Sequence, residues 1–321
     1  MQTAPGLGPL LARNGLKSRT LKLLHHIGRL PHAVKVDRRW RVYLRLGRVS
    51  NLPTVWTNCL AGLILAGAFP TATDFMLLSA SISLLYVSGM FLNDAFDQDF
   101  DRRYRPERPI PAGDISGPAV YKFGFGLMAA GLVALLVSAP RGEAAVWGIV
   151  LSLLIVFYDW RHKKIAASPV VIALCRVTVY FCAASTVGTA IDAKVMGGAG
   201  ILMAYMIGLS YVAKQENLTE IQTLWPLILL TAPFLYVSHV LLRFDGQSIL
   251  YVLFFIWVVY ALTHLFKKPK SIPYAVVSLI AGISLLDGLL IASVGPQGFW
   301  SWFGIAGFVL TVAFQRYIPG T

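Results

Sequence analysis

Apolar runs separated by short charged or turn-forming breaks make up most of this chain. Each run approaches the length of about 20 residues that crosses a bilayer as a helix. Ten such runs lie at about 54–73, 74–93, 118–138, 144–159, 168–190, 196–214, 223–242, 248–266, 274–294 and 298–316. The pattern predicts an all-α polytopic membrane helical bundle.

The composition supports this prediction. Hydrophobic residues occupy 56% of the 321 positions and charged residues only 13%, a balance that excludes ordinary aqueous domains. The apolar runs leave no room for a separate soluble domain. We therefore expect a basic N-terminal arm, residues 1–47, followed by one transmembrane domain, residues 48–321.

The net charge of +13 also suits a protein that binds nucleic acid, but the positions of the basic residues favour the bilayer as the partner. With the N-terminus inside, 24 of the 28 Lys and Arg lie in cytosolic segments, and only Arg141, Lys194 and Arg243 lie in external loops. This partition follows the positive-inside rule. It places the N-terminus and residues 94–117 in the cytosol and requires no nucleic acid.

The N-terminal arm is strongly basic, because residues 1–50 hold eleven Lys and Arg against one acidic residue, Asp37. Leucines between residues 16 and 30 alternate with basic residues and could form an interfacial amphipathic helix. An organelle transit peptide is the competing interpretation, since the stretch is basic and acid-poor. We expect a bacterial plasma membrane with a basic arm on its surface.

The main polar segment follows the second apolar run, where four of the fifteen acidic residues fall within eight positions. If the helix continues, Asp94, Asp97 and Asp101 share one face, Asn93 joins it, and Asp99 points elsewhere. Crowded carboxylates suit Mg²⁺, which takes its remaining ligands from phosphates. The arginines that follow can hold a diphosphate. They are Arg102, Arg103, Arg105 and Arg108.

This segment resembles the first aspartate-rich motif of the UbiA superfamily of intramembrane prenyltransferases. Two ordered parts carry the likeness: Asn93-Asp94-x-x-Asp97-x-x-x-Asp101 and Arg108-Pro109-Ile110-Pro111-Ala112-Gly113. The amino-acid sequence of residues 105–111 is most similar to that of the EboC-like bacterial branch. Members of the superfamily usually have nine spans, so we expect a bundle of nine or ten transmembrane helices.

A weak internal repeat predicts two pseudo-repeated halves. Pro53 to Cys59 and Pro169 to Cys175 have the same spacing, each at the start of a run. One run later each half carries an acidic cluster, residues 94–101 in the first half and residues 216–220 in the second. Halves related in this way place their sites face to face.

The resemblance implies that the second acidic cluster also binds metal. Glu216 and Glu220 are four residues apart and can share a ligand on one helix face, where the superfamily usually has two aspartates. An ordinary surface pair is the alternative. The implied Mg²⁺ ligands are therefore Asp94, Asp97, Asp101, Glu216 and Glu220.

Further substrate contacts are implied near the ends of other runs. Relatives often have a Tyr-x-x-x-Lys motif where this chain has Tyr158 and His162, so the cationic role passes to Lys163 or Lys164. An Arg before the first span and an Asn within it, here Arg48 and Asn58, are expected near the diphosphate or the acceptor. Lys214, Asn93 and Arg108 complete the predicted substrate contacts. For Arg48 and Lys164, simple flanking of a span is an alternative.

Two ionisable residues lie within predicted spans, Arg176 and Asp287. Charge at such a depth is costly and marks a functional cavity or a buried ion pair. The sequence does not decide whether the two residues meet.

Together these residues predict Mg²⁺-dependent transfer of a prenyl group from an isoprenyl diphosphate to an aromatic or other hydrophobic acceptor. Asp94, Asp97, Asp101 and Lys163 would act on the leaving diphosphate, and Asp159 could accept a proton from the acceptor. The alternative is a membrane protein on the same scaffold that binds or moves a lipid or hydrophobic metabolite.

Overall fold

A computed structural model describes residues 38–139, 142–188, 191–214, 225–266, 271–295 and 298–320, and among these residues every regular element is a helix. In chain order the elements are α2 (Arg38–Leu46), η1 (Val49–Asn51), α3 (Leu52–Leu65), α4 (Ala72–Phe96), α5 (Gln98–Tyr104), α6 (Gly117–Ser138), α7 (Glu143–Arg161), α8 (Ser168–Thr186), α9 (Ala193–Lys214), η2 (Trp225–Thr231), α10 (Ala232–Tyr236), α11 (Ser238–Leu241), α12 (Ser248–Phe266), α13 (Ile272–Ser293) and α14 (Gly298–Gln315). The amphipathic helix predicted between residues 16 and 30 lies outside the described residues.

The helices of the bundle belong to one compact unit, Val42–Thr321. Seven of its described helices are long and apolar enough to cross a membrane: α4, α6, α7, α8, α9, α12 and α13. They confirm the all-α polytopic fold class. The division predicted at residue 47 stays a prediction.

Three of the ten predicted runs form shorter or broken helices. The first run contains α3, whose 14 residues extend only about 21 Å, less than the hydrocarbon core of about 30 Å. The run at 223–242 is divided into η2, α10 and α11; Pro233 stands in the first turn of α10, where its missing N–H interrupts the preceding hydrogen-bond ladder. The last run forms the shorter apolar helix α14.

Local sequence explains where several helices begin. At α4, Thr71 Oγ1 accepts a hydrogen bond from the Asp74 N–H at 3.1 Å, and the Asp74 carboxylate accepts one from the Thr71 N–H at 3.3 Å. This reciprocal cap satisfies two N–H groups that have no partner inside the helix. Proline occupies the first turn of α3, α6, α8 and α13, where no N–H is needed: Pro53, Pro118, Pro169 and Pro273.

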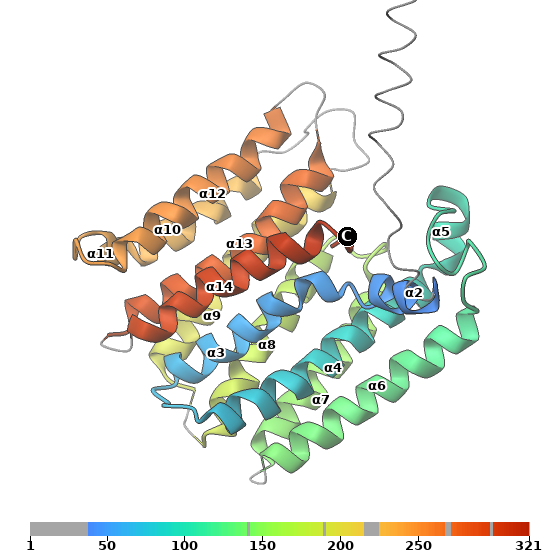
Figure 1. Ribbon diagram of the computed structural model, residues 1–321, viewed down its shortest axis with the longest axis horizontal. Helices are drawn as coiled ribbons and strands as arrows, with labels where there is room; N and C mark the ends of the chain where they lie inside the picture. The colour runs from blue at the N-terminus through green and yellow to red at the C-terminus, as the bar shows by residue number, and fades with distance from the viewer. Residues whose placement is uncertain are drawn as a thin grey trace, which may run out of the picture. The chain divides into compact units, whose positions relative to one another are not determined.

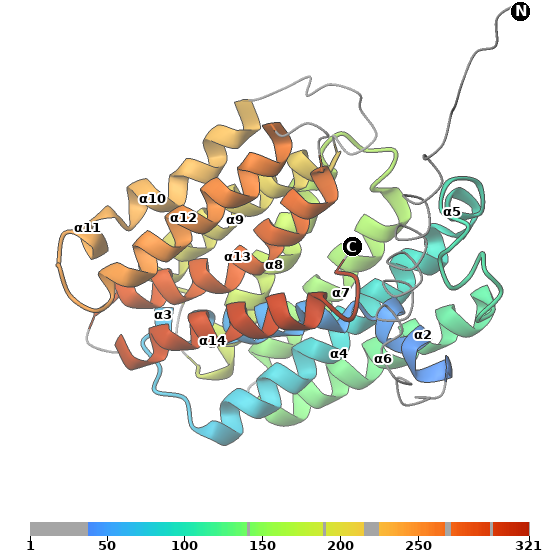
Figure 2. The same cartoon turned by 45° about the horizontal axis from the view of Figure 1, so that its top comes forward.

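Helix α3 lies at the centre of the unit, in contact with α4, α8, α9, α13 and α14. Two apolar cores meet on α3 and α8, one shared with α4, α6 and α7 and the other with α9, α12 and α13. Figures 1 and 2 show α4, α6 and α7 on one side of α3 and α12 and α13 on the other. The predicted division into two pseudo-repeated halves stays a prediction.

The backbones of α3 and α8 approach closely at Gly62. A Cβ atom at this position would lie 2.7 Å from Ala183 Cβ and 2.9 Å from Tyr180 Cα. Small residues allow this kind of approach between membrane helices. The contact brings the polar residues of α3 next to those of α8.

Candidate active site

A cavity of about 690 Å³ lies within the bundle, a size typical of small-molecule sites. At one end its lining comes from the last residues of α4, α7 and α9 and the first residues of α8 and α13. Farther along, the lining is apolar and includes Val55, Ile82, Leu151 and Ile283. Such a cavity can hold a molecule with a charged head and a long apolar tail.

The aspartate-rich segment forms an almost continuous helix, as the spacing predicts. Asp97 stands between α4 and α5 with a helical backbone (φ −85°, ψ −1°). The hydrogen bonds run on through this residue, because the Asp97 N–H donates to the Asn93 carbonyl at 3.0 Å and the Asp101 N–H donates to the Asp97 carbonyl at 2.9 Å.

The three aspartates on the predicted face are buried, whereas Asp99 is not. Asp94, Asp97 and Asp101 are between 2% and 9% exposed. The Asp99 side chain is 84% exposed and pairs with Arg102 at 2.9 Å. The prediction that Asp99 points away from the shared face is confirmed.

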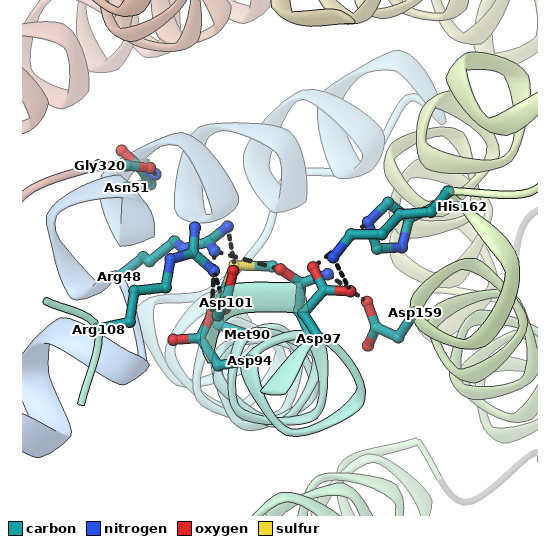
Figure 3. A network of polar contacts seen from close by, with 12 residues as sticks. Arg48, Asn51, Met90, Asp94, Asp97, Asp101, Arg108, Asp159, His162 and Gly320 are labelled. Carbon is teal, nitrogen blue, oxygen red and sulfur yellow. Dashed lines mark hydrogen bonds and ion pairs between the residues drawn. The ribbon is translucent and has the colours of Figure 1, made fainter. Parts of the chain in front are cut away.

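Two arginines neutralise one part of this cluster. Arg108 Nη1 lies 3.0 Å from both Asp94 Oδ1 and Asp101 Oδ2, and Arg48 Nη2 lies 3.2 Å from Asp94 Oδ1. Figure 3 shows both guanidinium groups reaching the carboxylates from the same side. Arg48 comes from the turn before α3 and Arg108 from the loop after α5, so the ion pairs tie three segments together.

The other part of the cluster is held from α7. Lys163 Nζ lies 2.7 Å from Asp97 Oδ1, and His162 Nε2 lies 3.5 Å from Asp97 Oδ2; Figure 3 shows His162 on the side opposite to Arg48 and Arg108. Burial raises the pKa of Asp97, but His162 and Lys163 outweigh it and hold that pKa below its ordinary value. The structure thus brings both residues at the end of α7 to the cluster.

Lys163 also lies over the ring of Phe100, 3.6 Å from its centroid, which holds the ammonium group by a cation–π contact. Nearby, burial raises the pKa of Asp101 above its ordinary value, although Arg108 opposes the effect. We call the seven residues Arg48, Asp94, Asp97, Asp101, Arg108, His162 and Lys163 the aspartate cluster.

Asp159 adds a fourth carboxylate beside the cluster. Its Oδ1 accepts a hydrogen bond from Asn93 Nδ2 at 3.1 Å, while its buried Oδ2 has no partner among the described residues. A buried polar atom without a partner is rare in proteins. Asp159 lines the cavity, where a bound donor or cation would complete this oxygen.

The donor set fits Mg²⁺ in its chemistry, because hard carboxylate oxygens are the ligands this ion prefers. Within the described residues no three His, Cys, Asp or Glu side chains converge on one point. Instead Asp94 and Asp101 turn to Arg108, and Asp97 turns to Lys163. Glu216 and Glu220 lie outside the described residues.

The remaining predicted substrate contacts divide into two groups. Tyr158 and Lys214 line the cavity. The ring of Tyr158 stacks on that of His162, with 4.9 Å between the ring centroids. Lys214 Nζ donates a hydrogen bond to the Ala166 carbonyl at 3.1 Å. Asn58, in contrast, is 0% exposed and is not part of the lining. Its predicted contact with substrate stays a prediction.

Asn58 joins the two ionisable residues of the predicted spans. Its Oδ1 accepts a hydrogen bond from Arg176 Nη1 at 2.7 Å, and its Nδ2 donates to both oxygens of Asp287 at 2.9 and 2.8 Å. Arg176 and Asp287 are therefore connected through an amide rather than by a direct ion pair.

Further neutral groups complete this arrangement. Thr54 Oγ1 accepts from Arg176 Nη2 at 2.9 Å, while Thr57 and Tyr180 donate to Asp287 at 2.5 and 2.6 Å. Thr54, Thr57 and Tyr180 were missed by sequence reasoning, because a hydroxyl in an apolar run is common and carries no signal of its own. We call the six residues Thr54, Thr57, Asn58, Arg176, Tyr180 and Asp287 the buried network.

The profile of the UbiA prenyltransferase family matches residues 54–320. The chain belongs to this family. UbiA relatives named digeranylgeranylglyceryl phosphate synthase are similar to part of it: 29% identity over 123 residues with the Sulfolobus acidocaldarius protein, covering 38% of this chain and 43% of the relative, and 34% over 125 residues with the Ignicoccus hospitalis protein, covering 39% and 40%.

The match thus spans less than half the length of these curated UbiA relatives. A solved structure of a digeranylgeranylglyceryl phosphate synthase superposes with a TM-score of 0.54 at 19% identity, covering 86% of this chain and 99% of the other. This likeness shows a shared fold. The predicted resemblance to the superfamily is confirmed, and the narrower likeness to the EboC-like branch stays a prediction.

Proposed function

We propose that this protein transfers a prenyl group from an isoprenyl diphosphate to a hydrophobic acceptor, with Mg²⁺ bound to the diphosphate. One observation carries the proposal: at one end of an apolar cavity, three aligned carboxylates meet cations from three other segments. A diphosphate with Mg²⁺ needs both kinds of group, and its prenyl tail needs the apolar walls. Membership of the UbiA family supports the same function.

Asp94, Asp97 and Asp101 would hold Mg²⁺, with Glu216 and Glu220 expected to complete the site. When bound, the ion stabilises the negative charge that develops on the leaving diphosphate. Arg108 and Lys163 already lie against these carboxylates at 2.7–3.0 Å. With the carboxylates holding metal, the ammonium of Lys163 and the guanidinium of Arg108 would be available to phosphate oxygens.

In the transfer step the bond between prenyl C1 and the diphosphate oxygen breaks, and its electron pair leaves with the diphosphate. The acceptor's nucleophilic atom then bonds to the allylic C1 and loses a proton. Arg108, Lys163 and Lys214 stabilise the leaving group where its charge develops. Asp159, whose Oδ2 has no partner among the described residues, is the proposed proton acceptor.

The walls of the cavity protect the allylic cation from water. Leu151, Ile155, Val179 and Ile280 are among the apolar lining residues. Tyr86 and Tyr158 also line the cavity, and their ring faces can stabilise a passing cation. Excluding water prevents hydrolysis of the reactive intermediate.

The proposed acceptor is an aromatic compound or another hydrophobic molecule. The UbiA relatives are named for digeranylgeranylglyceryl phosphate, so a geranylgeranyl-bearing glyceryl phosphate is the first acceptor to test.

The protein is an integral membrane protein, and we propose a bacterial plasma membrane with the aspartate cluster on the cytosolic side. Labelling by a membrane-impermeant thiol reagent should then distinguish Ala112→Cys (cytosolic) from Ala193→Cys (external); the opposite result would reverse the orientation.

The experiment uses the full-length protein in liposomes with radiolabelled isoprenyl diphosphates of several lengths, with and without Mg²⁺, and a panel of acceptors that includes aromatic acids and prenylglyceryl phosphates. We expect a labelled lipid product that requires Mg²⁺. Lys163→Gln should lower its formation at least about tenfold, because a charge-assisted contact is lost. Its neighbour Lys164→Gln is the matched control and should stay within about twofold.

A protein that binds the labelled diphosphate without ever transferring it would support the alternative of a lipid-binding membrane protein. One observation favours that alternative: Asp94 and Asp101 are already neutralised by Arg108. Product formation that is equal with and without Mg²⁺ would contradict the proposed role of the carboxylates.

A further inference from the structure

Arg176 is a cation in the wall of the cavity, and its hydrogen-bond partners belong to the buried network and not to the aspartate cluster. It is the ninth residue of α8 (Ser168–Thr186), about 12 Å along the helix from its first residue. It lines the same cavity as Arg108 and Lys163. An ionised side chain at such a depth in a span is costly and marks a functional position.

The guanidinium is held from one side by neutral oxygens. Nη1 donates to Asn58 Oδ1 at 2.7 Å and Nη2 donates to Thr54 Oγ1 at 2.9 Å. Among the described residues Arg176 makes no direct ion pair. A guanidinium has five N–H donors, so about three are left for a partner on the cavity side.

The nearest acid of the network cannot be that partner. Asp287 is 0% exposed, and both of its oxygens already accept hydrogen bonds from Thr57, Asn58 and Tyr180. The hydrogen bonds that connect it to Arg176 run through the Asn58 amide. Asn58 and Asp287 are therefore positioning residues, which orient the guanidinium while leaving its cavity side open.

Arg176 thus offers donors for an anion that is not the diphosphate. The prenyl diphosphate takes the cations of the aspartate cluster at one end of the cavity, and its tail requires apolar wall. An anionic group that binds Arg176 in the same cavity must therefore belong to the second substrate, the acceptor. Tyr86 also lines the cavity, with its ring centroid 5.8 Å from Arg176 Cζ, and supplies a flat face for the body of that substrate.

We propose that Arg176 binds an oxyanion of the acceptor, a carboxylate or a phosphate, and so orients the acceptor towards prenyl C1. This rests on the proposed function and narrows the acceptor to molecules with an apolar or aromatic body and one anionic group. Arg is suited to the role because its planar fork matches two oxygens of such a group.

The test measures binding of decyl phosphate, decanoate and the neutral decanol to the full-length protein in nanodiscs of zwitterionic lipid. A saturating non-reactive geranyl thiolodiphosphate with Mg²⁺ occupies the aspartate cluster, so the probes report on the remaining cavity. We expect one or both anions to bind about tenfold or more tightly than decanol. Preference for the phosphate or for the carboxylate identifies the kind of acceptor.

Arg176→Gln should reduce this preference to about threefold or less, while affinity for the thiolodiphosphate stays within about twofold. Arg243→Gln is the matched control, because Arg243 donates to the Ala292 carbonyl at the end of α13 and is not part of the cavity lining. It should change neither affinity. If Arg176→Gln does not fold, Arg176→Lys, which keeps the charge but loses the fork, should still weaken anion binding about threefold.

An unchanged preference in these variants, or an equal loss of thiolodiphosphate binding, would overturn the proposal. The two hypotheses fail separately. If no acceptor is ever prenylated but anion binding depends on Arg176, the proposed function fails and the subsite stands. If transfer occurs and Arg176→Gln leaves the KM of the acceptor unchanged, the subsite fails and the function stands.

Discussion

The aspartate cluster and the buried network hold their charges in opposite ways. In the cluster, carboxylates touch cations directly, as in the contact of Asp97 with Lys163 at 2.7 Å. In the network, Asp287 accepts hydrogen bonds from hydroxyl and amide groups. Asn58 lies between Asp287 and Arg176 and is hydrogen-bonded to both. On the proposed function, the first arrangement would exchange partners when Mg²⁺ and a diphosphate bind. In the second arrangement only the Asp287 carboxylate is saturated, and the contacts of Arg176 with Asn58 and Thr54 hold its guanidinium in the cavity wall.

On the proposed function, this difference predicts that the cluster takes part in the chemistry and that Asp287 and its partners position the wall. In the cluster, the side chain of Lys163 is 34% exposed. A ligand can therefore reach its ammonium group. The network sits on α3, α8 and α13, the central helices of the bundle, and Asp287 is wholly enclosed. Substitutions of Asp287 and its hydroxyl donors should therefore act first on stability, and substitutions in the cluster first on turnover.

The largest effect is expected for Asp287→Ala. It removes the acceptor for three buried donor groups and leaves Arg176 without its balancing charge, which should cost about 3–5 kcal/mol of folding free energy. The apparent melting temperature in detergent should fall by about 5 °C or more. Asp287→Asn keeps the shape and one acceptor oxygen and should cost less; a variant as stable as the wild type would show that the network carries no structural role.

Asp97→Asn should have the opposite profile. The substitution preserves volume but removes the charge that faces Lys163 and the proposed metal, so prenyl transfer should fall about 100-fold, equivalent to about 2.7 kcal/mol of transition-state stabilisation. The melting temperature should change little. Wild-type turnover in this variant would exclude the cluster from the reaction.

Much of the cluster could be predicted because its residues are close in sequence. Helical spacing was enough to place Asp94, Asp97 and Asp101 together and to turn Asp99 outward. The ion pairs of Arg48 and Arg108 were not predictable, since they depend on how the turn before α3 and the loop after α5 fold back onto α4. The splitting of the 223–242 run was also missed, because a hydropathy pattern does not register the backbone break at Pro233.

The buried network could be suspected from sequence but not assembled. Arg176 and Asp287 stood out as charges in apolar runs, yet they lie 111 positions apart in the chain. Only the packing of α3 between α8 and α13 brings Asn58 to both. The contact requires the close approach at Gly62, and no local pattern specifies which helices meet there.

A smaller effect should reveal how tightly the cluster is coupled. Arg48 and Arg108 both contact Asp94 Oδ1, at 3.2 and 3.0 Å. Each Gln variant alone should weaken binding of the geranyl thiolodiphosphate, and the double variant should lose less than the product, with a coupling of about 1 kcal/mol. As the matched comparison, Arg108→Gln combined with Arg176→Gln should be additive, because these residues share no partner among the described residues. Equal coupling in both pairs would contradict the separation of the two regions.

The smallest effect is expected at Asp99, two positions from both Asp97 and Asp101. Asp99 is as acidic as its neighbours and belongs to the same helical segment, but its side chain is 84% exposed and its partner Arg102 is 58% exposed. Water screens such a pair, which contributes about 0–1 kcal/mol to stability. Asp99→Asn should therefore keep prenyl transfer within about twofold of the wild type and leave the melting temperature almost unchanged. A loss comparable to that of Asp97→Asn would mean that net negative charge in the segment drives the reaction, and that the burial and orientation that separate Asp97 from Asp99 do not matter.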